Sequence, residues 1–186
     1  MLGQTLVIGR RTNVNWDNTK SLYIPNDVTK TARKKGKLFL VKGIDYFFIA
    51  RNAFPWNFIP DMVIARFGYD NFVVATAIAN NVSVVDATKT LLAVHQTDVE
   101  GNFAGRENTR HTHINTDIIF NLIENEPRIY LHRGYTSSAQ YETIYVRRKS
   151  DDTVNVMVIK RTKFFKLRRT KQKNETIQHI MKQNTL

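Results

Sequence analysis

An aspartate stands where an expected helix begins. Asp70 lies in Gly68-Tyr69-Asp70-Asn71, directly before an apolar segment over 72–80 whose pattern predicts a helix. A carboxylate in this place either caps the helix by accepting bonds from first-turn amides, or accepts a proton from a hydroxyl nucleophile. Asn71 beside it would hydrogen-bond the same substrate. Both interpretations stay open, and capping is the more common role of such an aspartate.

Two further polar residues close expected strands. Asp86 follows an apolar segment over 82–85, and His95 ends a second one over 91–95. Ligands of α/β sheets gather at the carboxyl ends of strands, so Asp86 is a candidate substrate-binding residue. Its alternative is an Asx-turn with Ala87 and Thr88. His95 is either a metal ligand or a structural histidine.

The elements that must position these residues alternate along the chain. This alternation of strands and helices is typical of an α/β fold. The continuous apolar segment 44–50 predicts a strand buried on both faces. Pattern and turn signals predict further strands over 6–11, 63–65, 82–85 and 91–95, helices near 72–80 and 115–126, loops over 51–61 and 98–113, and a hairpin of 141–147 with 154–160. The polar segment 13–37 is expected to be irregular, with a short helix near 27–35.

Composition excludes several classes of protein. The 186 residues include no cysteine, which excludes disulfides, thiolate nucleophiles and cysteine-bound zinc or iron–sulfur clusters. The phosphate-binding, dinucleotide-binding, nucleophile-elbow and zinc-protease motifs are also missing. The sequence shows neither a membrane-spanning apolar segment nor a signal pattern, so we expect a soluble chain.

The net charge of +12 is unevenly distributed. Residues 147–186 hold 12 of the 28 Lys and Arg but only 3 of the 16 Asp and Glu. We therefore divide the chain into a nearly balanced domain, 1–146, and a basic tail, 147–186. From Arg161 onward the tail is expected to form an amphipathic helix. Its cations alternate with aromatic residues, so it is either a nucleic-acid or anionic-surface binding segment or a solvated extension.

Several motifs occur in an order found in a known family. The chain resembles the C-terminal half of a glycosyltransferase-like family with the GT-A (nucleotide-diphospho-sugar transferase) fold over roughly residues 6–125. The motifs that carry the resemblance are Gly43-Ile44-Asp45-Tyr46-Phe47-Phe48-Ile49, Phe54, Ile59-Pro60, Ile64-Ala65-Arg66-Phe67-Gly68-Tyr69-Asp70-Asn71-Phe72, Val84-Val85-Asp86-Ala87-Thr88 and Ala93-Val94-His95-Gln96.

The resemblance implies a partial GT-A-like mixed sheet flanked by helices, acting on a sugar nucleotide and an acceptor. It implies that Asp70 is the catalytic base and that His95 completes the site of a divalent metal, Mn²⁺ or Mg²⁺. Arg51 and Arg66 match basic positions that face phosphate or sugar, or serve as structural ion-pair partners. Tyr69 replaces the usual tryptophan and keeps a ring that can stack on a sugar.

One departure from the family is important. GT-A enzymes hold metal and nucleotide largely through an Asp-x-Asp in an N-terminal half, and this chain contains no Asp-x-Asp. Such a metal would then have too few oxygen ligands to neutralise a leaving diphosphate. We therefore expect a truncated or inactive glycosyltransferase that transfers no sugar on its own. The alternatives are a basic protein binding through its tail and a non-catalytic interaction module.

Overall fold

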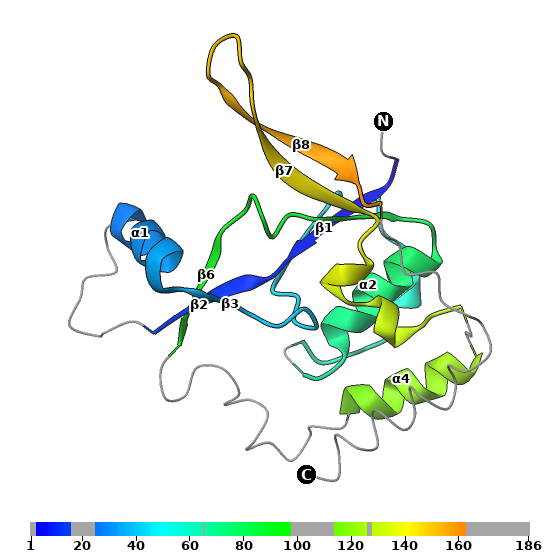
Figure 1. The fold of residues 1–186 in the computed structure, drawn as a ribbon. Helices are drawn as coiled ribbons and strands as arrows, with labels where there is room; N and C mark the ends of the chain where they lie inside the picture. The colour runs from blue at the N-terminus through cyan, green and yellow to red at the C-terminus, as the bar shows by residue number, and fades with distance from the viewer. Residues whose placement is uncertain (1–2, 16–24, 65, 98–113, 126–127, 163–186) are drawn as a thin grey trace.

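Residues 3–15, 25–64, 66–97, 114–125 and 128–162 are described by a computed structural model (Figure 1). Over these residues the chain forms two open mixed sheets and three α-helices. The expected α/β class is therefore confirmed. None of the three helices is long and apolar enough to cross a membrane.

The larger sheet has five strands in the order β4-β1-β5-β7-β8. Strand β1 runs parallel to β5 and antiparallel to β4, and β7 continues the parallel direction from β5, the central strand. The last strand, β8, is antiparallel to β7 and forms one edge. The strands span Thr5–Gly9 (β1), Tyr46–Ile49 (β4), Ser83–Asp86 (β5), Tyr141–Arg147 (β7) and Val154–Lys160 (β8).

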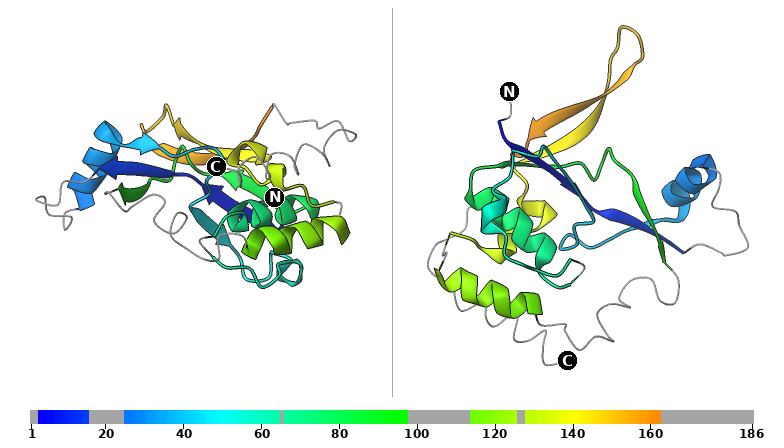
Figure 2. Two further views of the ribbon diagram at one scale, coloured as in Figure 1. Left: turned by 90° about the horizontal axis from the view of Figure 1, so that it is seen from below. Right: turned by 180° about the vertical axis from the view of Figure 1, so that it is seen from behind.

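The smaller sheet is built on the continuation of β1. Strand β2 (Arg11–Asn15) follows after the single residue Arg10, and Figure 2 shows the two strands nearly end to end. β2 lies between β3 (Lys37–Leu38), which is antiparallel, and β6 (Ala93–Thr97), which is parallel. Each half of this long strand thus has one antiparallel and one parallel neighbour.

Helix α2 (Tyr69–Ala79) forms the centre of the core. After its first turn it carries no charge, and both of its sides are buried. Val74 packs on the sheet with Ile8 and Val84, whereas Phe72 packs against Ile119 of α4 (Ile114–Asn125). Short 3₁₀ turns over Trp56–Phe58, Leu131–Arg133 and Thr136–Ser138 connect these layers.

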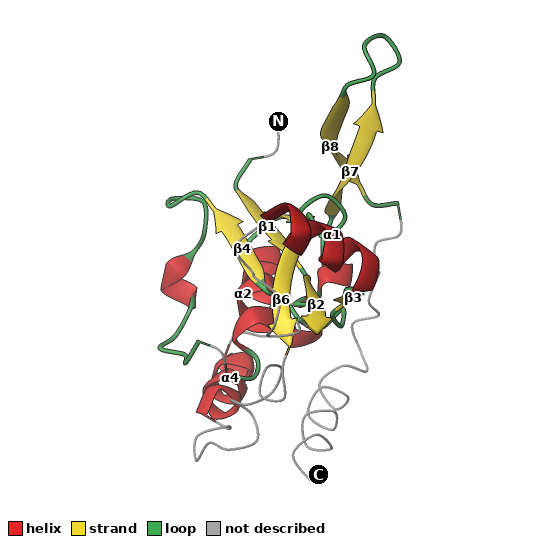
Figure 3. Cartoon of the chain, turned by 90° about the vertical axis from the view of Figure 1, so that its left-hand side faces the viewer, coloured by secondary structure: helices red, strands yellow, loops and turns green. Residues whose placement is uncertain are grey.

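Helix α1 (Pro25–Lys35) covers the smaller sheet, as Figure 3 shows. Its Ala32 is buried against Val14 of β2. The last turn of α1 carries three basic residues, Arg33, Lys34 and Lys35. This second, small core depends on the larger one, because β2 is held in place through β1.

Most of the predicted elements are confirmed. The hairpin strands 141–147 and 154–160 are found with the predicted bounds. The helix predicted over 72–80 begins three residues earlier. The other elements are present with shifted ends; these are the helices near 27–35 and 115–126 and the strands over 6–11, 44–50, 82–85 and 91–95. The loop predicted over 98–113 lies outside the described residues.

Three predictions are wrong. Val63 and Ile64 form no strand and lie in the loop before α2. The strand β4 is not buried on both faces, since Phe48 is 53% exposed. The segment after Asn13 was expected to be irregular, but Asn13 and its neighbours form β2 and pair with two strands.

The hairpin of β7 and β8 projects from the body of the molecule (Figures 1 and 3). The expected boundary at residue 146 falls inside β7, which begins in the larger sheet beside β5. Arg161 and Thr162 follow β8 without entering a helix, and the rest of the expected tail helix lies outside the described residues.

Gly134 provides a test of the packing around α2. A methyl group at Gly134 would collide with the backbone of Asn71, in the first turn of the central helix. Because backbone cannot rotate away, we expect Gly134→Ala to lower the free energy of unfolding by about 2 kcal/mol or more, measured by urea denaturation. Gly3→Ala is the control, since nothing lies within 4 Å of its added methyl group. Equal stability of the two variants would contradict this packing.

Candidate functional site

Charged side chains gather at one end of the larger sheet. The parallel strands β1 and β5 both end here, with Ile8 beside Asp86. Because β4 is antiparallel to β1, it begins at the same end, with Tyr46 beside Gly9. The residue before β4, Asp45, therefore also lies at this end, where α/β sheets commonly bind ligands.

Arg11 and Asp45 form a partly buried ion pair at this end. The Arg11 Nη1 lies 2.6 Å from Asp45 Oδ1, and the Arg11 backbone amide donates to Oδ2 at 3.0 Å. The side chains are only 16% and 14% exposed. The Asp45 amide donates to the Gly9 carbonyl, and the Arg11 guanidinium lies 4.1 Å from the Phe39 ring centre. The Asp45 carboxylate is thus fixed in position.

Asp70 is the second residue of α2 and does not cap it. Gly68 precedes the helix in a left-handed conformation, with φ of 88°, and supplies no side chain to the free amides. A methyl group at Gly68 would also meet the side chain of Ile119. Asp70 is therefore not the N-cap residue, although its own first-turn backbone amide favours its ionised form and its charge complements the helix dipole.

The environment of the Asp70 carboxyl disfavours its charged form. Burial, followed by the charge of Asp45, raises the pKa of Asp70 from 3.8 to about 6, against smaller opposing effects of its own backbone amide and of Arg11. Within the described part of the chain no side chain hydrogen-bonds to this carboxyl. A carboxylate with a pKa near neutrality is suited to accept a proton from a hydroxyl group.

Tyr46 adds a hydroxyl group to the same end of the sheet. Its ring lies over Gly9, where a methyl group would collide with the tyrosine oxygen. The oxygen is buried and has no hydrogen-bond partner among the described residues. Burial, then the charges of Asp86 and Asp45, raises the pKa of Tyr46 to about 12. The hydroxyl therefore stays protonated and able to donate.

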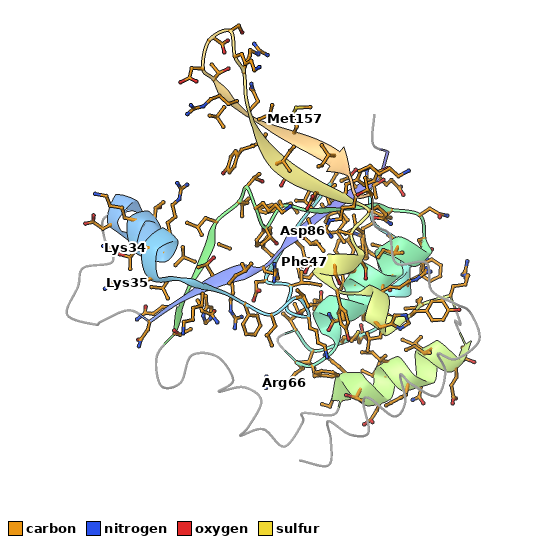
Figure 4. All side chains as sticks on the ribbon, in the orientation of Figure 1. Lys34, Lys35, Phe47, Arg66, Asp86 and Met157 are labelled. Atoms are coloured by element: carbon orange, nitrogen blue, oxygen red, sulfur yellow. The ribbon has the colours of Figure 1, made fainter. Side chains whose placement is uncertain are left out.

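Asp86, a predicted substrate-binding residue, is engaged within the protein. Its Oδ1 accepts bonds from the amide and hydroxyl groups of Thr88, which confirms the Asx-turn. Its Oδ2 lies 2.6 Å from Arg161 Nη2, and the Arg161 Nε lies 3.4 Å from Glu142. Arg161 was assigned to the tail, yet its side chain is only 18% exposed. This pair joins the end of β8 to the end of β5, where Figure 4 labels Asp86.

Two of the predicted substrate-binding residues, both on α2, make contacts that stabilise the fold. The Asn71 amide donates to the carbonyl oxygens of Lys42 at 2.9 Å and Gly134 at 2.8 Å, and so joins two loops to the helix. Tyr69, the first residue of the helix, packs against the core cluster beneath the larger sheet. Their expected contacts with a substrate remain predictions.

The remaining predicted residues lie apart from Asp70. Arg51 is exposed after the end of β4, at the opposite end of the sheet. Arg66 lies in the turn before α2, and Figure 4 shows it beside α4. His95 is on β6 of the smaller sheet, next to Asn13. Of the residues that the structure describes, no three His, Asp or Glu form a group that could hold a metal ion.

Arg11, Asp45 and Tyr46 were missed as members of this cluster. Asp45 stands directly before a strand in Gly43-Ile44-Asp45, and Arg11 stands directly after one. The rule that drew attention to Asp86 applies equally to Arg11, because both follow parallel strands. What sequence alone lacked was the pairing of β1 with β4 and β5, which brings the three residues together.

Comparison of the chain with protein-family models, with curated proteins and with solved structures found no match.

The raised pKa of Asp70 predicts a pH-dependent stability. Between about pH 4 and pH 6 the folded protein keeps a proton that the unfolded chain has lost, so stability falls as pH rises through this window. Asp70→Asn removes the free-energy cost of ionising this buried carboxyl. We expect the variant to be more stable than the parent by up to about 3 kcal/mol at pH 7, with the difference shrinking below pH 4.

Urea denaturation between pH 3.5 and pH 8 measures this difference. Asp61→Asn is the matched control, because Asp61 is exposed, and we expect it to change stability by less than about 0.5 kcal/mol. A pH-independent difference, or an Asp70→Asn protein less stable than its parent at pH 7, would show that Asp70 is not held in this way.

Proposed function

We propose that the chain is a glycosyltransferase-like domain that keeps the acceptor side of a sugar-transfer site. In this proposal Asp70 binds a hydroxyl group of a saccharide acceptor and is the base that would take its proton. The single observation that carries the proposal is the carboxyl of Asp70, which has no side-chain hydrogen-bond partner among the described residues and whose pKa is raised to about 6 at the start of a buried helix.

The cost of this arrangement supports a functional role. A carboxyl with such a pKa destabilises the folded state at neutral pH, and an asparagine would avoid the cost without changing the shape. Strongly perturbed groups of this kind are concentrated in functional sites, where stability is exchanged for activity. The fixed charge of Asp45, held by Arg11 at 2.6 Å, adds to the basicity of Asp70.

The ordered motifs supply the second line of support. Asp45, Tyr46 and Asp70 belong to segments that resemble the glycosyltransferase-like family, and the fold brings these segments to one end of the sheet. The Tyr46 hydroxyl keeps its proton, because its pKa is raised to about 12, but its oxygen is buried. We propose that Asp70 contacts the acceptor and that Tyr46 supports the site from the interior.

The donor side is proposed to be inactive in this chain. His95 lies in the smaller sheet, and the described residues place no group of metal-binding side chains around it. These residues do not fit a divalent metal on a sugar-nucleotide diphosphate, which needs several hard oxygen ligands. The sequence also contains no Asp-x-Asp. We therefore propose that the chain binds saccharides without transferring a sugar on its own.

Binding and turnover test the two parts separately. Saturation-transfer NMR with a panel of neutral oligosaccharides is expected to detect binding by the parent chain. We expect Asp70→Asn to weaken it roughly tenfold or more, because a charge-assisted hydrogen bond is lost. Asp61→Asn should bind like the parent, and the expected higher stability of Asp70→Asn excludes unfolding as the cause.

Transfer is measured with the same chain, Mn²⁺ and a panel of sugar nucleotides, and we expect no metal-dependent release of nucleotide diphosphate. Turnover would refute the proposed inactivity while supporting the family. Absence of binding to every saccharide, or equal binding by the parent and Asp70→Asn, would refute the acceptor site.

A further inference from the structure

Helix α1 presents a surface made of cations. Residues 28–44 contain six Lys and Arg and no Asp or Glu. Four of these six lie on α1 and are exposed; they are Lys30, Arg33, Lys34 and Lys35. Arg33 and Lys34 follow Lys30 by three and four residues, so these three side chains are neighbours on one side of the helix. We call Lys30, Arg33 and Lys34 the cationic face.

The other side of the helix is fixed to the protein. Val28 and Ala32 precede and follow Lys30 by two residues, which places them on the opposite side of α1. They pack with Val14 of β2, and Ala32 is only 2% exposed. Figures 1 and 2 show α1 at the margin of the described structure, with the smaller sheet on one side of it. The cationic face is therefore held on a fixed support and directed to solvent.

No acidic partner neutralises the cationic face in the part of the chain that the structure describes. There, no Asp or Glu forms an ion pair with Lys30, Arg33 or Lys34. Asp27, the one acid of α1, lies in the first turn and complements the helix dipole. Cations of the last turn complement the dipole too, but Lys30 lies before that turn. Like charges three and four residues apart destabilise a helix, so a bound anion would relieve the repulsion within this face.

The composition of α1 distinguishes between kinds of anionic partner. A helix that binds a lipid surface presents large apolar residues to it, whereas the apolar residues of α1 face the smaller sheet. Single-stranded nucleic acids are bound by aromatic side chains that stack on their bases, and residues 25–35 contain no aromatic residue. Lysine and arginine without either feature are suited to the phosphates of a duplex, whose bases are already stacked.

We propose that the cationic face of α1 binds the phosphate backbone of double-stranded DNA without reading its sequence. The major groove of B-form DNA is about 12 Å wide and admits an α-helix, whereas the major groove of A-form RNA is too narrow. With α1 along the groove, the cationic face contacts phosphates at its edges. Lys35 adds a charge beside Lys34 at the end of α1, where Figure 4 labels both residues. This interaction does not depend on the proposed acceptor site.

Fluorescence anisotropy of the full chain with a short DNA duplex of mixed sequence tests the proposal. A variant with Lys30→Gln, Arg33→Gln and Lys34→Gln removes three charges and keeps good helix formers. We expect it to bind the duplex about tenfold more weakly or worse. The slope of log affinity against log salt concentration should fall in magnitude by about 3, because one phosphate contact is lost with each cation.

The matched control removes the same net charge from the tip of the hairpin. It carries Arg147→Gln, Arg148→Gln and Lys149→Gln, and two of these cations are already paired, Arg147 with Asp152 and Arg148 with Asp151. We expect this control to bind the duplex like the parent. An equal loss of affinity in both variants, or no loss in the α1 variant, would overturn the proposal, because binding would then follow net charge or lie elsewhere.

Two further measurements complete the test. Tighter binding of the parent to duplex RNA or to phosphatidylserine vesicles than to DNA, lost in the α1 variant, would assign the cationic face to another partner and overturn the proposal. Amide hydrogen exchange of the parent chain needs no variant. The amides of residues 30–35 should exchange more slowly with the DNA duplex than without it, and unchanged exchange there would also overturn the proposal.

Discussion

The ion pair between Arg11 and Asp45 lies where one sheet passes into the other. β1 ends at Gly9 and β2 begins at Arg11, so a single residue separates strands that belong to different sheets. Asp45 holds the start of β2 through two bonds from Arg11, while its own amide bonds to Gly9 at the end of β1. The pair therefore ties the start of β2 to the end of β1 and to the residue before β4. Both side chains are largely shielded from solvent, at 16% and 14% exposed. Removing either partner would therefore leave the other charge poorly solvated.

The same pair contributes to the electrostatics of the candidate site. Burial is the larger cause of the raised pKa of Asp70, and the charge of Asp45 adds to it. Asp86 is a contrasting case, because Arg161 neutralises it directly and Thr88 satisfies its other oxygen. Of these three carboxylates, only Asp70 has no side-chain partner in the described structure.

Local sequence patterns predicted most of the elements but few of their contacts. The hairpin strands and α2 have periodic, apolar sequences bounded by turn residues, and these were located to within a few residues. β2 was missed because Arg11–Asn15 is mostly polar and its pairing partners lie far along the chain. Arg161 was assigned to the tail because its neighbours are basic, whereas its burial depends on Asp86, 75 residues earlier. Such long-range pairs have no local signal in the sequence.

The proposed acceptor site depends most on the protonation state of the Asp70 carboxyl. It can be observed directly by following the ¹³C resonance of that carboxyl during an NMR titration of the parent chain from pH 3 to pH 9. We predict a midpoint near pH 6, well above that of an ordinary aspartate, because burial and the charge of Asp45 both oppose ionisation. A midpoint at or below pH 4 would contradict the account, since Asp70 would then be a well-solvated or paired surface carboxylate with no special readiness to accept a proton.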